Sequence, residues 1–192
     1  LLLKWLRGTH ISNLQGMLWK NTPFIRPLLN CRKNELKQYL KSNNFSWMED
    51  STNLSSTYLR NRVRMELIPL LNELTREGLD SRISDLNGQS SLLREWLDKE
   101  YTEWSITTRS AESKCDCKIS LNELEKVDRL IQEEIIFKFI TTKTNIELSY
   151  KNLRNIFELL ISENKHWEYT LSEEWKLVNS RNELTLQNEP KS

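Results

Sequence analysis

Two arginines lie four residues apart in a stretch able to bind an anion. Residues 58–67 carry Leu59 and Val63 at helical spacing, which predicts a helix. On a helix, Arg60 and Arg64 leave the same face one turn apart. Two guanidinium groups at that spacing can clamp a phosphate or a base edge with paired hydrogen bonds. Backbone amides near the helix N-terminus also favour an anion, so the pattern predicts contact with a phosphate or nucleotide.

Acidic and amide side chains stand in the polar loop before this helix. Glu49 and Asp50 are able to hold the two arginines in place, and Asn53 follows closely. Asp50 or Asn53 could equally form an Asx-turn by bonding to the backbone two residues on. A third alternative is an acid–base network that only ties the loop to the helix, since structural ion pairs are common. The residues alone leave these alternatives open.

Charge is unevenly distributed along the 192 residues, whose formal net charge is +1. Residues 1–70 hold 11 Lys and Arg against 4 Asp and Glu, a net of +7. The rest of the chain holds 17 against 23, a net of −6. A basic front half argues for a polyanionic partner, although a solvated basic face would give the same composition.

Composition excludes several other classes of protein. The apolar runs are too short to span a bilayer, so we expect no membrane partner. Three cysteines, Cys31, Cys115 and Cys117, do not make a disulfide framework. A metal site at Cys115 and Cys117 would need two further ligands, and the only histidines, His10 and His166, are far away in sequence, so we expect no metal site. The role of the Cys-x-Cys pair is left open.

The front half reads as short mixed elements. Residues 2–6 read as the end of a helix that Gly8 stops. Residues 24–29 have strand character, residues 32–42 form a helix, and the helix from Tyr58 kinks or restarts at Pro69. Since the chain begins with three leucines and no Met, we take it to begin inside a helix of a longer protein.

The rear half reads as mainly helical. Residues 79–104 form one long helix, Ser120 and Glu123 form a capping box for the next, and Ser149 caps a third. The alternating tail around Trp167 and Trp175 predicts a short hairpin. The fold class is therefore α/β followed by mainly α, with a boundary near residues 72–80.

Several motifs, in order and spacing over roughly the first 74 residues, resemble the tRNA(Ile)-lysidine synthetase family of PP-loop ATP pyrophosphatases. The ordered set is specific, although each motif alone is weak. The motifs are Leu1-Leu2-Leu3-x-x-Leu6-Arg7-Gly8, Leu14-x-Gly16-Met17, Ile25-Arg26-Pro27-Leu28-Leu29, Glu35-Leu36-x-x-Tyr39-Leu40, Trp47-x-Glu49-Asp50-x-x-Asn53, Tyr58-x-Arg60-Asn61-x-x-Arg64 and Leu67-x-Pro69-x-Leu71.

The resemblance implies a fold and a domain division. Residues 1–75 would be the C-terminal portion of a Rossmann-like PP-loop ATPase domain that binds nucleotide and tRNA. Residues 76–192 would be a helical, tRNA-binding second domain with a terminal hairpin. The family's PP-loop and acidic motifs would lie upstream of residue 1, so the chain alone is not expected to turn over and no catalytic residue is assigned to it.

The resemblance also implies a reaction. Family members use ATP with Mg²⁺ to adenylate the C2 oxygen of the wobble cytidine, position 34, of a CAU-anticodon tRNA(Ile), releasing pyrophosphate. The side-chain amine of free L-lysine then displaces AMP and forms lysidine. The implied compartment is a bacterial cytoplasm or a plastid stroma. A homodimer is one alternative for the oligomeric state.

Site residues carry over only at matching positions. Arg7 and Gly8 match the family's helix end beside the nucleotide, although a plain helix stop explains them too. Arg60, Asn61 and Arg64 match the residues that face ATP and the target cytidine. Supporting roles are implied for Glu49, Asp50 and Asn53. Three tryptophans of the basic half are able to stack on unpaired bases: Trp5, Trp19 and Trp47.

Two other functions compete with this prediction. One is a different PP-loop tRNA-modifying enzyme such as a thiolase, against which stands the lack of a Cys pair placed for sulfur transfer. The other is a non-catalytic helical module that binds RNA or serves as an adaptor.

Overall fold

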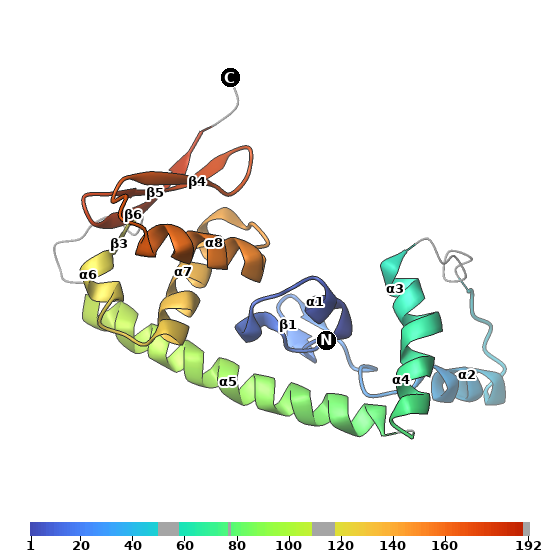
Figure 1. Ribbon diagram of the computed structural model, residues 1–192. Helices are drawn as coiled ribbons and strands as arrows, with labels where there is room; N and C mark the ends of the chain where they lie inside the picture. The colour runs from blue at the N-terminus through green and yellow to red at the C-terminus, as the bar shows by residue number, and fades with distance from the viewer. Residues whose placement is uncertain (50–57, 77, 109–117, 190–192) are drawn as a thin grey trace. The chain divides into compact units, whose positions relative to one another are not determined.

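The computed structural model describes residues 1–49, 58–76, 78–108 and 118–189 (Figure 1). The described chain separates into two compact units that do not follow the order of the sequence. The first contains Leu1–Leu3 and Gln15–Gly88, and the second contains Lys4–Leu14 and Gln89–Ser192. The predicted functional assignment of residues 1–75 and 76–192 stays a prediction, but the segment 4–14 packs with the second unit.

The first unit is built from short elements. It holds a two-stranded antiparallel ladder, β1 (Lys20–Asn21) and β2 (Phe24–Ile25), and the helix α2 (Lys33–Ser42). The strand character predicted over residues 24–29 is confined to Phe24–Ile25, and the strand ends before Pro27, which has no N–H to donate and whose position indicates a strand end. The α2 prediction is confirmed, and the Glu35 carboxylate accepts the Arg32 backbone N–H at 2.9 Å in its first turn.

Three helical segments follow one another without a break in the first unit. They are α3 (Leu59–Arg62), the π-helix η3 (Val63–Leu67) and α4 (Ile68–Leu74). The Ile68 N–H donates to the Val63 carbonyl, a bond one residue wider than that of an α-helix. The wide turn precedes Pro69, which occupies the first turn of α4, where its missing N–H costs little. The change predicted at Pro69 thus takes the form of a π-turn ahead of it.

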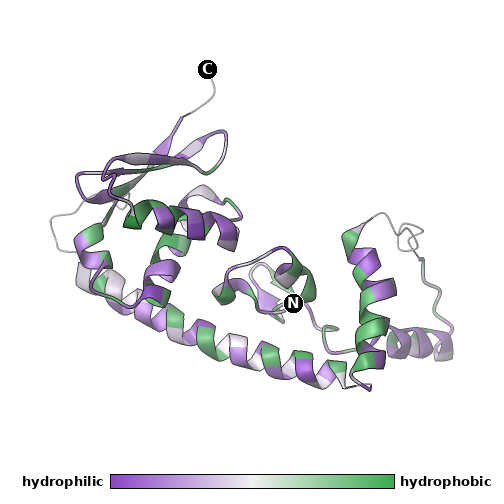
Figure 2. Ribbon diagram, viewed as in Figure 1, coloured by the Kyte–Doolittle hydropathy of each residue, from purple (hydrophilic) through white to green (hydrophobic). Residues whose placement is uncertain are grey.

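The helix α5 (Leu79–Thr108) supplies residues to both units. It has 30 residues, longer than the predicted 79–104, and Gly88 lies within it. Green and purple bands alternate along it (Figure 2), as expected for a helix that presents apolar and polar side chains in turn.

The second unit contains the main hydrophobic core. Its elements are α1 (Leu2–Leu6, from Lys4 on), the 3₁₀ helix η1 (Ile11–Asn13), part of α5, α6 (Leu121–Leu124), α7 (Arg129–Thr144), α8 (Tyr150–Ile161) and a four-stranded antiparallel sheet. The strands are β3 (Lys118–Ser120), β4 (Trp167–Thr170), β5 (Trp175–Ser180) and β6 (Glu183–Asn188), in the order β3-β6-β5-β4.

The tail hairpin predicted around Trp167 and Trp175 is present as β4 and β5, and the sheet extends beyond it. In register, Tyr169 lies opposite Leu177, Leu177 opposite Leu186, and Ile119 opposite Leu184. The sheet packs on α7 and α8 through side chains that are fully excluded from solvent: Ile135, Ile136, Ile140, Leu153, Ile156, Leu177 and Leu184.

Both predicted helix starts are present, but only one has its capping bond. Ser149 caps α8, since its Oγ accepts the Asn152 N–H at 3.2 Å. Ser120 is the N-cap residue of α6, but its side chain makes no capping bond and the helix has only 4 residues. The long helix α7 starts after Asp128 instead.

Candidate nucleotide-binding helix and the Arg-Gly corner

The helix α3–η3 presents both predicted arginines to solvent. Asn61 and Val63 are buried, with exposed fractions of 8% and 6%, whereas Arg60 and Arg64 are exposed. Within the described residues, no ion pair joins Arg60 or Arg64 to a carboxylate. Both side chains are thus exposed and free of a carboxylate partner in the described chain, and their contact with a nucleotide stays a prediction.

The arginine between them is differently placed. Arg62 is exposed and its guanidinium nitrogen lies 3.2 Å from the Glu66 carboxylate, one helical turn on. The Arg62 guanidinium is thus already paired with a carboxylate of its own helix. The contrast distinguishes Arg60 and Arg64 from their neighbour by geometry alone.

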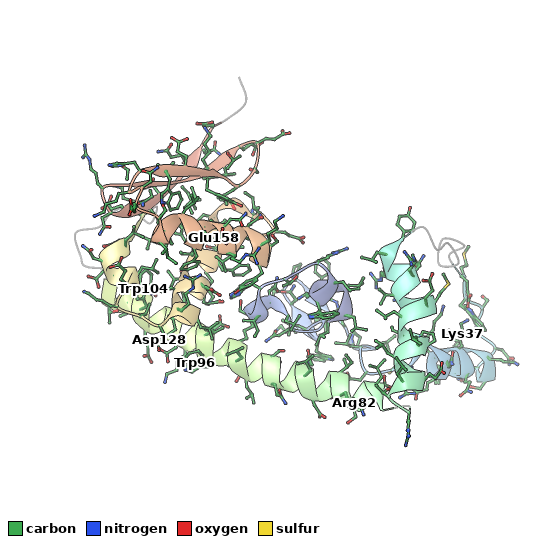
Figure 3. The ribbon with its side chains drawn as sticks, viewed as in Figure 1. Lys37, Arg82, Trp96, Trp104, Asp128 and Glu158 are labelled. Carbon is green, nitrogen blue, oxygen red and sulfur yellow. The ribbon has the colours of Figure 1, made fainter. Side chains whose placement is uncertain are left out.

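Of the three supporting residues predicted in the loop, only Glu49 lies in the described part of the chain. Its carboxylate forms an ion pair with Lys37 of α2, a residue labelled in Figure 3. The hydrogen bond from Lys37, with its positive charge, lowers the pKa of the Glu49 carboxyl. Asp50 and Asn53 lie outside the described residues. The Lys37 pair connects the end of the loop to α2, so the supporting role toward the arginines stays a prediction.

Arg7 and Gly8 form a corner in the second unit. Gly8 has φ +67°, a left-handed conformation that L side chains rarely adopt, and a Cβ there would meet no atom within 4 Å. Its carbonyl accepts the Tyr150 N–H at 2.9 Å, and Thr9 bridges to Ser149 beside it. The glycine therefore lets the chain turn onto the start of α8. Arg7 is exposed next to this turn, on the rim of a cavity.

A buried polar cluster, which the sequence did not predict, lies behind the corner. His10 is fully excluded from solvent, and its ring nitrogens lie 3.8 Å from a Glu133 oxygen and 3.6 Å from a Glu134 oxygen. Its Nδ1 also lies 2.8 Å from the Ser12 hydroxyl, and its ring stacks on Phe137. The available signal was the pair Glu133-Glu134 between Ile131 and Ile135 in an apolar helix.

Charge partners decide the ionisation of this cluster. Burial acts to raise the pKa of the Glu133 carboxyl, but the neighbouring His10 and the hydrogen bond and charge of Arg129 outweigh it and leave the pKa below its usual value. The Arg129 Nε donates to Glu133 at 2.9 Å. Glu133 is therefore held as a carboxylate by its two neighbours.

The three tryptophans of the basic half are all accessible. The exposed fractions are 64% for Trp5, 56% for Trp19 and 44% for Trp47. Trp167 is buried in the core of the second unit. Trp96, in the rear half, is 42% exposed and does not join that core. Stacking of the first three on bases stays a prediction.

The described residues contain no group of three or more His, Cys, Asp or Glu side chains able to hold a metal ion. Cys115 and Cys117 lie outside those residues. No helix of the described chain has the length and apolar character needed to cross a bilayer.

Comparison with known proteins shows what this chain is similar to. Residues 1–71 match the model of a PP-loop domain. The chain is 33% identical over 142 residues to a tRNA(Ile)-lysidine synthase of Treponema denticola, an alignment covering 70% of the chain and 30% of that protein.

Two other relatives bear the same name and align with almost the whole chain. The protein of Enterococcus faecalis is 28% identical over 196 residues, and that of Bacteroides thetaiotaomicron is 26% identical over 191 residues. Each alignment covers 97% of the chain, and 42% and 41% of the respective relative. The chain thus spans less than half the length of these relatives, and the resemblance stated from the motifs is confirmed.

Proposed function

We propose that this protein, a member of the PP-loop family through its first 71 residues, acts as a tRNA(Ile)-lysidine synthase. ATP activates the wobble cytidine of a CAU-anticodon tRNA(Ile) by adenylation of its C2 oxygen, with loss of pyrophosphate. The side-chain amine of L-lysine then bonds to C2, loses a proton and displaces AMP. The compartment would be a bacterial cytoplasm or a plastid stroma.

The observation that carries the proposal within this chain is the pair Arg60 and Arg64. Both matching arginines are exposed, both lie on one helix, and neither is neutralised by a carboxylate of the described chain. Cations held in this way stabilise the negative charge of a phosphate or of an activated base. Asn61, which stands between them in the sequence, is buried. We assign binding of ATP and the target cytidine to the two guanidinium groups.

The described residues fit the anionic part of ATP but not its metal. Arg60 and Arg64 are exposed donors suited to phosphate oxygens. Magnesium prefers carboxylate and water oxygens, and the described residues gather no such ligand set. We therefore derive no step through magnesium.

The test is incorporation of labelled lysine into a CAU-anticodon tRNA(Ile) by the full-length gene product, with ATP present. We expect Arg64→Ala to abolish incorporation while the circular dichroism spectrum and the melting temperature stay unchanged. Arg62→Ala is the matched control, because Arg62 lies on the same helix but is paired with Glu66. Wild-type incorporation by Arg64→Ala would show that this arginine has no role in the reaction. Absence of incorporation by the wild type would refute the function.

A further inference from the structure

A cavity of about 740 Å³ opens in the second unit, and no part of the proposed reaction uses it. Its walls come from the segment 4–13, from α5, from α7 and from the loop 145–149. A volume of this order suits a small organic ligand or one nucleotide. Every lining residue belongs to the second unit, so the cavity is complete within that unit.

Positive charge collects on one part of the wall. Lys4, Arg7 and Arg94 all line the cavity. The Lys4 Nζ donates to the backbone carbonyl of Asn13 at 2.9 Å, and the Arg94 guanidinium donates to the backbone carbonyl of Ser12 at 3.2 Å. These two carbonyl groups carry no net charge and hold both cations beside the same short segment.

The remaining charges of the wall leave this positive region in place. Lys138 is paired with Asp98 and lies 3.7 Å from a Glu134 oxygen, and Arg94 approaches Asp98 at 3.6 Å. Within the described chain, Lys4 and Arg7 have no carboxylate partner at ion-pair distance. Burial, together with the charge of Arg94, lowers the pKa of Lys4, and Glu147 offsets this only in part. An anion here would relieve the repulsion between the cations.

Two other features of the wall define the rest of the ligand. Tyr101 and Phe137 provide aromatic surface, and Ile146 and Leu148 add apolar surface. Glu134, only 2% exposed, also lines the cavity, and its Oε2 receives no hydrogen bond within the described chain. A buried carboxylate oxygen without a donor favours a ligand that brings an N–H group. A phosphate, a flat ring and an amino group together describe a nucleotide.

We propose that this cavity binds one unpaired nucleotide, with its phosphate on Lys4, Arg7 and Arg94 and the amino group of its base directed to Glu134. The nucleotide is either an unstacked residue of the tRNA or a free nucleoside monophosphate, and only the first source rests on the proposed function. In the tRNA case, the cavity holds a nucleotide other than the cytidine that reacts.

Two substitutions alter the charge of the cavity while leaving the proposed reaction site untouched. Lys4→Gln removes one cation. Asn145→Asp adds one negative charge at a lining residue with φ 55°, a left-handed conformation that Asp also tolerates. The matched control is Asn164→Asp, outside the cavity, where the side-chain oxygen accepts the His166 N–H and a carboxylate accepts it equally. Melting curves verify that all three variants fold. If Lys4→Gln does not fold, Asn145→Asp alone tests the cavity.

The readouts are the affinity of the full-length protein for fluorescein-labelled tRNA(Ile), by anisotropy, and for AMP, CMP, GMP and UMP, by calorimetry. We expect Lys4→Gln and Asn145→Asp each to weaken binding about fivefold, and Asn164→Asp to leave it unchanged. Weakened tRNA binding identifies the tRNA as the source. Weakened binding of a mononucleotide alone identifies the free nucleotide.

Unchanged affinity for all of these ligands in both cavity variants would overturn the proposal. Lysine incorporation by the wild type is measured in parallel, so that the two hypotheses fail separately. A wild type that incorporates no lysine but binds nucleotide through Lys4 would refute the proposed function and leave the cavity assignment standing.

Discussion

The role proposed for Arg64 rests on the surroundings of its side chain and not on its charge alone. Arg60, Arg62 and Arg64 share one helix, yet only Arg62 has a carboxylate partner within the described chain. The sequence motif by itself distinguishes Arg60 and Arg64 from Arg62. The pairing of Arg62 with Glu66 was not foreseen, although the two are four residues apart and oppositely charged.

The shape of the guanidinium group gives a first prediction. Lysine keeps the charge of Arg64 but offers a single ammonium instead of a planar fork, so paired hydrogen bonds to a phosphate or base edge are lost. We expect Arg64→Lys to lower kcat/KM for lysine incorporation about 10- to 100-fold, a cost of about 1–3 kcal/mol. Arg62→Lys should change it less than twofold. Full activity of Arg64→Lys would mean that charge alone suffices.

The buried carboxylate Glu133 gives a second prediction, which concerns stability and pH. Its pKa is lowered in the folded state, so its contribution is present above the ordinary value of 4.5 and is lost as pH falls through the folded pKa. We expect Glu133→Gln to reduce the free energy of unfolding at pH 7 by about 1–2 kcal/mol. The difference from wild type should shrink as pH falls below 4.5 in denaturant titrations.

An exposed glutamate provides the comparison. Glu158, on α8 (Figure 3), is 3.8 Å from Arg154 and largely exposed. Glu158→Gln should change stability by less than about 0.5 kcal/mol, because solvent screens such pairs. Equal effects at the two sites would contradict the role given to the buried cluster.

At the scale of elements, local signals were reliable where one interaction decides the outcome. The α8 start at Ser149 and the hairpin around Trp167 followed from a capping hydroxyl and from alternation. Ser120 had the same capping signal, but its neighbour Leu121 is held by the carbonyl of Asn182 in the adjoining turn. That contact joins residues far apart in sequence, and no local pattern contains it.

The π-turn was also beyond local reasoning. Pro69 predicted a kink or restart, but the extra residue is accommodated before it, over Val63–Leu67. The turn places Arg64 where the helix widens, so Arg60 and Arg64 are related by a mixed turn rather than an ideal α-helical one. π-turns inside helices occur frequently at functional sites.

The Arg-Gly corner gives a third prediction. Because Gly8 has φ +67° and open space around its α-carbon, any cost of a side chain there is conformational and not steric crowding. We expect Gly8→Ala to lower the free energy of unfolding by about 1 kcal/mol. Gly8→Asn should cost less, because Asn adopts the left-handed region more easily. Chemical denaturation measures both, and equal stability of wild type and Gly8→Ala would contradict the backbone argument.

At the scale of the molecule, the uneven charge gives a fourth prediction. If the basic front half contacts RNA phosphates, each contact contributes to the salt dependence of binding. We expect Lys33→Gln with Lys41→Gln, both exposed on α2, to reduce the slope of log affinity against log salt by about 1.4–1.8. Lys126→Gln with Lys165→Gln, both exposed in the acidic half, should leave the slope unchanged. Equal changes of this slope in the two double variants would contradict the inference drawn from the uneven charge.

The packing of residues 4–14 with residues 89–192 has a consequence for recombining this protein with its relatives. From the sequence, residues 75 and 76 look like a natural junction for a chimera. If this protein supplied residues 1–75 and a relative supplied the rest, His10 would meet foreign residues in place of Glu133 and Glu134. In the reverse chimera, Glu133 and Glu134 would lose His10 as their neighbour in the protein interior. A stable chimera must therefore exchange residues 4–14 together with residues 89–192, although these two stretches are separate in the gene.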